Sequence, residues 1–202
     1  MLIGLGAFAC RDDARHAPSL VGGLDGGPVA ALDGGLEHQP DGARGDAGRG
    51  PLTPATACAP VAQVLPVTAP AYHRTGKIDY PDPPPVGGDH NPCWGKWGVY
   101  DASSPLAVEH WVHNLEHGGV VYLYNCADGC ADEVAQMASF VDGRTQAILT
   151  PYAALPTRFA VVAWGVRITS DCFDKTSFER FYSEHVNHGS EQISSDPPSS
   201  CL

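Results

Sequence analysis

The large aromatic side chains of this chain are unevenly distributed, and their distribution limits where a folded core can form. All four Trp and all seven Tyr residues occur after residue 58. Residues 11–57 are rich in Gly, Pro, Ala and Asp and contain almost no large apolar side chains. Such a segment cannot bury enough apolar surface to offset the conformational entropy lost on folding. We therefore predict a single globular domain over residues 58–202, preceded by a flexible tether over residues 11–57.

Residues 1–10 have the character of a truncated lipoprotein-type export signal. Residues 2–9 are apolar and end in small residues directly before Cys10. This arrangement resembles the lipobox of bacterial lipoproteins, in which the cysteine carries the lipid. The run is short and lacks a preceding basic segment, which indicates that the natural start lies upstream. We expect a periplasmic or cell-surface lipoprotein held to the membrane through Cys10 alone; the alternative is an accidental apolar leader with an unrelated Cys.

The remaining cysteines all fall in the predicted domain, at Cys58, Cys93, Cys126, Cys130, Cys172 and Cys201. An even number of cysteines in one domain indicates an oxidising compartment and up to three disulfides. Cys126 and Cys130 are the first expected pair, because a turn brings them close. A second candidate pair is Cys58 with Cys201, which would tie together both ends of the domain. A thiolate metal site is disfavoured, because the Cys-x3-Cys spacing has no second copy.

Hydrophobic periodicity predicts a domain of mixed helices and strands. Apolar residues recur at helical spacing over 108–115, after Ser104 and Pro105 as N-cap and first helical residue and before Gly118 as terminator. This predicts a helix over 105–117. Further helices are expected over 132–142 and after Asp174, and strands over 61–67, 120–124, 146–150 and 158–165. Because no regular βαβ repeat is visible, we predict an α+β fold with a small mixed or antiparallel sheet and about three helices.

The charge balance limits the partners of this chain. The formal net charge is −11 and the isoelectric point is about 5.0. No basic stripe is present, so a nucleic-acid partner is not expected. An acidic surface attracts cations in general. The sequence does not indicate a protein partner.

The string from Val112 to Gly119 is the strongest functional signal. It places His113, Glu116 and His117 within five residues. Two histidines four positions apart lie on the same side of either a helix or a strand, so they can bind one metal ion in both cases. On the predicted helix, this polar face lies away from the apolar stripe and also carries Glu109.

Several short motifs appear in a fixed order around this string. They are His73, Tyr80–Pro85, Gly88-Asp89-His90, Gly98-Val99-Tyr100, the string itself, Pro151-Tyr152 and Ala163-Trp164-Gly165. In this order the chain resembles a bacterial family of exported or membrane-anchored proteins without an assigned function, over about residues 70–190. The resemblance implies no activity. The additional cysteines depart from the family pattern, and they suggest that disulfides stabilise this version.

The first functional hypothesis is an envelope protein that binds, sequesters or delivers a transition-metal ion. The ligands would be His73, His90, His113 and His117, with Glu109 or Glu116 able to complete the site. Imidazole ligands suit Cu(II) and Zn(II), and we place copper slightly ahead. The count of two Met argues against a thioether-rich Cu(I) site.

Three alternatives remain open. His113-Asn114-Leu115-Glu116-His117 fits the H-x-x-E-H pattern of zinc hydrolases, in which Glu116 would act as the general base. A third ligand would then come from Glu133, Glu179 or Glu184. The second alternative is a metal-free surface interaction module that uses Trp and Tyr side chains. The third is that the histidines only form a solvated helix face and satisfied loop groups.

Overall fold

A computed structural model gives the fold of residues 59–201. The predicted signal segment with Cys10, the predicted tether and Cys58 lie outside these described residues. Within residues 59–201, no helix combines the length and the apolar character needed to cross a membrane.

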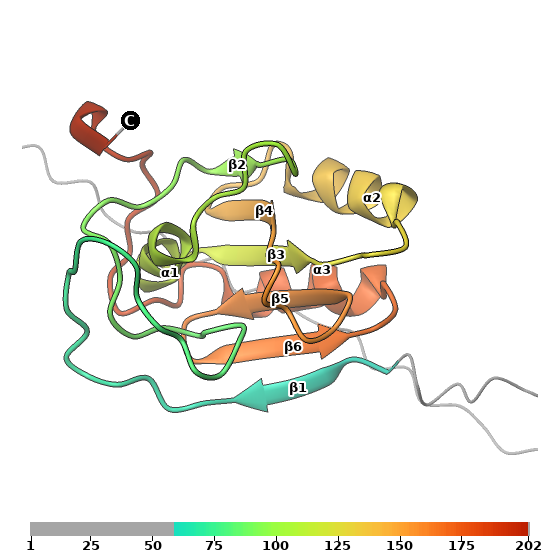
Figure 1. Cartoon of the computed structure of the whole chain (residues 1–202), viewed down its shortest axis with the longest axis horizontal. Coiled ribbons are helices and arrows are strands. Elements are labelled where there is room, and N and C mark those ends of the chain that lie inside the picture. Colours follow the sequence, from blue (N-terminus) through green and yellow to red (C-terminus); the bar gives the residue numbers. More distant parts are fainter. Residues whose placement is uncertain (1–58, 202) are drawn as a thin grey trace, which may run out of the picture. The chain divides into compact units, whose positions relative to one another are not determined.

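The centre of the fold is a mixed six-stranded sheet. Its strands are β1 (Val61–Val64), β2 (Gly98–Val99), β3 (Val120–Tyr124), β4 (Ala147–Pro151), β5 (Phe159–Ala163) and β6 (Val166–Ser170). The strand order is β1-β6-β5-β3-β4-β2 (Figure 1). β4 pairs in parallel with both β2 and β3, whereas β5, β6 and β1 extend the sheet through antiparallel pairs.

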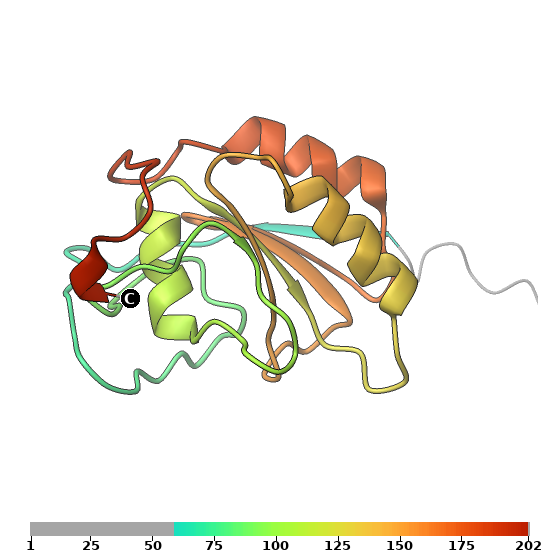
Figure 2. The same cartoon turned by 90° about the horizontal axis from the view of Figure 1, so that it is seen from above.

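Helices cover both faces of this sheet. The described residues form three α-helices, which are α1 (Val108–Glu116), α2 (Ala131–Val141) and α3 (Lys175–His185), and a short 3-10 helix at Ser199–Cys201. α1 lies on one face, and α2 and α3 lie on the other (Figure 2). Alternate residues of β3 divide the core accordingly, because successive strand side chains point to opposite faces. Val120 and Tyr122 pack toward α2 and α3, whereas Val121 and Leu123 pack toward α1. The predicted α+β class is confirmed.

The start of α1 differs from the prediction, whereas its end agrees. Ser104 does not cap the helix; its backbone N–H donates to the Asp101 carboxylate in a preceding turn. The helix begins at Val108, and Ala107 at the N-cap position makes no side-chain capping bond. At the other end, Gly118 has a φ of +82°, a conformation that glycine adopts without steric cost.

The remaining elements agree with the pattern except at β2 and β6, which were not predicted. α2 lies within one residue of the predicted range, and Asp174 caps α3 by accepting from the N–H groups of Thr176 and Ser177. The predicted strand over 158–165 ends at Ala163. Gly165, with a φ of +78°, then turns the chain into β6. β2 is too short for a period to show, and the buried Arg167 hides the apolar pattern of β6.

The disulfides correct one predicted pairing. Cys126 and Cys130 are bonded, as the turn between them predicts. Cys201 pairs with Cys93 and not with Cys58, across a sequence separation of 108 residues. Cys172 is also disulfide-bonded. The Cys58–Cys201 prediction was wrong because it used the ends of the domain as a guide. The final segment of the chain returns instead to the loop before α1.

Candidate metal centre

His90 enters the site at the end of the proline-rich loop. Its backbone N–H donates to the Tyr72 carbonyl at 3.1 Å, and its carbonyl accepts from the Arg74 N–H at 2.7 Å. This short parallel pairing places His73 beside His90, with 5.0 Å between the ring centroids. The pairing therefore brings His73 to the site.

Asp89 holds the two segments of this pairing together. Its side chain accepts from the Tyr72 N–H at 3.0 Å and forms an ion pair with Arg74 at 2.6 Å. Its carbonyl accepts from the Tyr80 hydroxyl at 2.7 Å. The loop that carries His90 is consequently fixed by hydrogen bonds as well as by its prolines.

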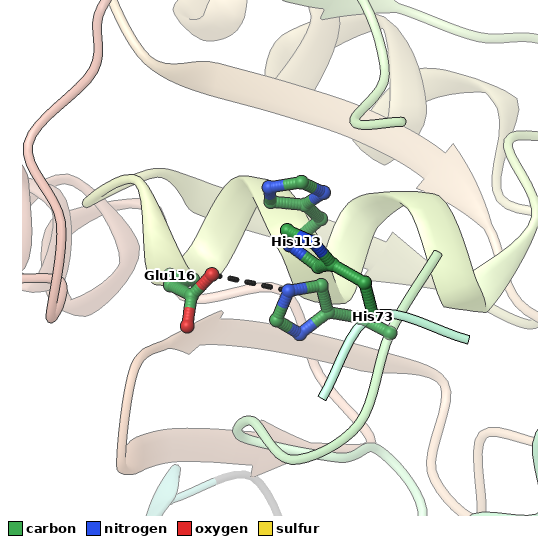
Figure 3. A group of neighbouring side chains, drawn as sticks. His73, His113 and Glu116 are labelled. Carbon is green, nitrogen blue, oxygen red and sulfur yellow. Dashed lines mark ion pairs between the residues drawn. The ribbon is translucent and has the colours of Figure 1, made fainter. Parts of the chain in front are cut away.

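The polar face of α1 carries His113, Glu116 and His117, and it is buried. His113 is 2% exposed and His117 is 1% exposed. The Glu116 side chain is 13% exposed. Figure 3 shows the Glu116 carboxylate turned toward the histidine rings. Its Oε2 atom pairs with His90 Nε2. The alternative of a solvated helix face is therefore wrong, because α1 is covered on its polar side too.

The cover comes partly from residues 187–196, which we call the C-terminal strap. Three strap N–H groups donate to carbonyls at the end of α1, from Asn187 to Gly118 at 2.7 Å, from Glu191 to Glu116 at 2.8 Å and from Ile193 to His117 at 3.3 Å. Gly189 lies directly against the Glu116 carbonyl and the Gly118 N–H, where a side chain would clash. This docking places Glu191 Oε2 3.2 Å from His117 Nε2.

The imidazole rings of His90 and His113 are oriented in the same way. The Nδ1 atom of His90 lies 2.8 Å from the Gly88 carbonyl, and that of His113 lies 2.7 Å from the Asn91 carbonyl. Because a carbonyl oxygen only accepts, each Nδ1 carries the proton and each neutral ring has its lone pair on Nε2. His90 Nε2 lies 3.1 Å from Glu116 Oε2, and His113 Nε2 lies 3.1 Å from the Nε2 atom of His117.

These residues form two overlapping sets of possible ligands. The first set comprises His73, His90, His113 and Glu116, and the second comprises Glu116, His117 and Glu191. Within each set, one donor atom per residue lies within 4.8 Å of all the others. Both sets are therefore compact enough to hold a metal ion, and Glu116 belongs to both.

Burial lowers the pKa of two imidazoles of this cluster, His113 and His117. It lowers the pKa of His113 to about 3, with a further contribution from the neighbouring His90. Burial also lowers the pKa of His117, partly offset by Glu191 and Glu116. The pKa of His90 is raised, because the contacts with Glu116 and Gly88 outweigh the effect of burial. Neutral imidazole is the form that binds metal ions.

Two ring nitrogens in the cluster are buried without a hydrogen-bond partner among the described residues. They are His90 Nε2 and His117 Nδ1. His90 Nε2 is close to Glu116, but the geometry of the contact does not make a hydrogen bond. Buried polar atoms are nearly always satisfied, so each exception requires an explanation. For His90 Nε2, a cation between the ring and the carboxylate would provide one.

The structure brings together all four predicted histidines and Glu116, but it assigns other positions to the remaining predicted glutamates. Glu109 accepts from the Ile78 N–H at 3.0 Å and so anchors the loop. Glu133 lies on α2, and Glu179 and Glu184 lie on α3, helices that pack on the opposite face of the sheet. Sequence reasoning missed Glu191, because the strap has no periodicity that would indicate its contacts.

Sequence reasoning also missed the role of Trp94. Its ring contacts His113 and His117 edge-on, at centroid distances of 5.3 and 4.5 Å. The indole N–H groups of Trp94 and Trp97 both donate to the carbonyl of Ser195, at 3.2 and 3.0 Å. Both tryptophans therefore hold the strap over the cluster.

Fold and site together define a class of protein, an α+β domain with a histidine–glutamate cluster on one helix and its covering loops, buried except at His73 and Glu191. The chain belongs to a family described as a protein of unknown function (DUF3105), whose model matches residues 72–198. The matched region includes every residue of the cluster, from His73 to Glu191. Comparisons with curated proteins and with solved structures gave no match.

Asn114 occupies the middle of the histidine string and has a positioning role. It is fully buried, and its side chain accepts from the Gly95 N–H at 2.8 Å and donates to the Gly95 carbonyl at 2.9 Å. Asn114→Ala leaves both backbone groups without these partners. We expect the free energy of unfolding to fall by about 1–3 kcal/mol, measured by urea denaturation. Asn125→Ala, at a partly exposed amide with two carbonyl acceptors, is the comparison variant. An equal or larger loss in Asn125→Ala would contradict the assigned role.

Proposed function

We propose that this protein binds a transition-metal ion through His73, His90, His113 and Glu116. The observation that carries the proposal is the orientation of His90 and His113. Each donates its Nδ1 proton to a backbone carbonyl and presents an Nε2 lone pair to the cluster. Histidines that bind metals use this arrangement, because the second hydrogen bond fixes both the tautomer and the ring.

The donor set favours Cu(II) or Zn(II). Among residues 59–201 thiolates do not compete as ligands, because all five cysteines there are disulfide-bonded. Imidazole and carboxylate donors suit both ions. Copper is our first choice, because Cu(II) binds a given site of nitrogen and oxygen donors more tightly than Zn(II) does. A protein that takes up zinc and excludes Cu(II) in direct competition would overturn that choice.

The proposed role is binding, sequestration or delivery of this ion in the bacterial envelope. The lipobox-like residues before Cys10 and the disulfides support an exported lipoprotein. Cell fractionation tests the anchor, because the Cys10→Ser chain is expected to leave the membrane fraction. A Cys10→Ser chain that stays in that fraction would argue against lipidation.

A zinc hydrolase is a second candidate, supported by the short distance between the Nε2 atoms of His113 and His117. It requires Glu116 to act as a general base on a bound water and not as a ligand. The Glu116 carboxylate instead lies among the ligand atoms of both sets. If Glu116 is a metal ligand, Glu116→Gln should weaken metal binding. If Glu116 is instead the general base of a hydrolase, this variant should keep its metal and lose only activity.

Metal content is the direct test of the proposed function. The full chain, produced in an oxidising compartment and freed of any affinity tag, is compared with His90→Ala/His113→Ala by elemental mass spectrometry. We expect at least about one copper or zinc per wild-type chain, and the double variant should lose one ion relative to the wild type. His188→Ala is the matched control, because His188 lies outside both ligand sets and bonds only to the Glu184 carbonyl.

The folded state of each variant is checked by near-ultraviolet circular dichroism. If the double variant does not fold, His90→Ala alone replaces it, because this change leaves α1 intact. A folded wild-type protein that contains no metal and binds neither Cu(II) nor Zn(II) on addition would end the proposal.

A further inference from the structure

The cluster contains more donors than one ion of the proposed kind uses. Four imidazoles and two carboxylates belong to the two ligand sets. Zn(II) in proteins commonly takes four ligands, and Cu(II) favours a four-ligand tetragonal plane. A coordination sphere of four ligands is already filled by His73, His90, His113 and Glu116. His117 and Glu191 are then left beside it, and both are turned toward the cluster.

The two oxygens of Glu116 face different parts of the cluster. Oε2 lies 3.1 Å from His90 Nε2, in the first ligand set. Oε1 lies 3.4 Å from the hydroxyl of Ser190, the strap residue directly before Glu191. One oxygen thus lies at the first ligand set and the other faces the strap that carries Glu191, an arrangement that suits a bridging carboxylate.

His117 Nε2 lies in an electron-rich position. It is 3.1 Å from His113 Nε2, which carries a lone pair, and 3.2 Å from the Glu191 carboxylate. One proton on His117 Nε2 can serve only one of these two acceptors. A metal ion on the Glu191 side of His117 would accept electron pairs from the ring and from the carboxylate together.

Glu191 is held at this position although its side chain is 56% exposed. Its own N–H donates to the Glu116 carbonyl, and the Ile193 N–H donates to the His117 carbonyl. The strap is thus bonded to the backbone of the same two residues whose side chains would share a metal ion with Glu191. An isolated surface carboxylate would have no such support.

We propose that the cluster holds two metal ions bridged by the Glu116 carboxylate. The first ion is the one in the proposed function, on which this inference rests. The second is bound by His117 and Glu191 together with the other oxygen of Glu116, and water completes its coordination on the exposed side. Paired sites of this kind hold their ions about 3.5–4 Å apart.

The test is the metal stoichiometry of the full chain after saturation with Cu(II) and removal of free ion by gel filtration. We expect about two copper ions per wild-type chain and about one in Glu191→Gln, which keeps the size of the side chain but removes its charge. Glu184→Gln is the matched control, because Glu184 is 57% exposed and belongs to neither ligand set. It should keep both ions.

Electron paramagnetic resonance on the same samples tests the bridge. Two Cu(II) ions about 3.5–4 Å apart should show magnetic coupling, and Glu191→Gln should show the spectrum of an isolated ion. A different result would be one copper per wild-type chain, lost with His90 and His113 but kept in Glu191→Gln. This result would overturn the second ion and leave the proposed function standing. Two uncoupled ions would overturn the bridge. A wild-type chain that takes up neither Cu(II) nor Zn(II) would refute both proposals.

Discussion

Replacing Cys93 and Cys201 together by Ala is expected to lower the free energy of unfolding by about 3–5 kcal/mol. The bond joins residues separated by 108 positions. A cross-link over so long a loop removes much conformational freedom from the unfolded chain, and the stabilisation grows with loop length. Chemical denaturation under oxidising conditions measures the change.

The same bond fixes the end of the C-terminal strap to the loop before α1. Trp94 follows Cys93, and its indole N–H holds the Ser195 carbonyl of the strap. Without the disulfide, this bond, the matching one from Trp97 and the three strap N–H bonds to the end of α1 must keep Glu191 at the cluster. We therefore expect strap amides such as that of Glu191 to lose protection from hydrogen exchange in this variant before the core strands do.

Cys126→Ala/Cys130→Ala is the matched control for this prediction. It removes a disulfide that spans only 4 positions, and the loop-length relation assigns that bond about 2 kcal/mol. Its cysteines lie at the start of α2, away from the histidine cluster. Equal losses of stability in the two double variants would show that the long loop and the strap contribute nothing extra.

Arg167→Met is expected to lower the free energy of unfolding by about 2–4 kcal/mol. Arg167 is 5% exposed and is the second residue of β6. Its guanidinium donates to the Gln63 side chain at 2.9 Å, to the Pro84 carbonyl at 2.7 Å and to both carboxylate oxygens of Asp82 at 2.9 and 3.1 Å. Met keeps much of the alkyl volume but leaves the buried Pro84 carbonyl without its donor.

The carbonyl contacts contribute more to this effect than the ion pair does. The Asp82 side chain is 66% exposed, and ion pairs with an exposed partner contribute little to stability. Asp82→Asn should therefore cost much less than Arg167→Met. Arg180→Met is the control for loss of an arginine, because Arg180 is 69% exposed on α3 and pairs with Glu184 at 3.8 Å. A loss in Arg180→Met as large as that in Arg167→Met would contradict the prediction.

Arg167 also connects the sheet to the candidate metal centre. Its partners Asp82 and Pro84 belong to the proline-rich loop that leads to His90. A positive charge inside a strand is unusual in a sequence pattern, and it obscured β6. The charge is explained by the loop carbonyls and the Asp82 carboxylate that its guanidinium contacts.

The sequence by itself determined where the core forms and which local elements form it. All Trp and Tyr residues lie after residue 58, and the apolar periods predicted α1, α2, β3 and β5 close to their observed positions. The spacing of His113 and His117 placed both rings on one side of α1, because four residues make about one helical turn. The short Cys126–Cys130 pair is also local, and it was predicted correctly.

Only the tertiary structure decided how distant segments meet around α1. Three features depend on loops without periodicity. They are the burial of His113 and His117, the position of His73 and Glu191 beside them, and the pairing of Cys93 with Cys201. Such loops are positioned by specific backbone hydrogen bonds, which leave no repeat in the residue pattern. Local spacing therefore predicted that the His113 and His117 rings share one side of α1. Long-range packing buried these rings and brought the carboxylates of the cluster to them.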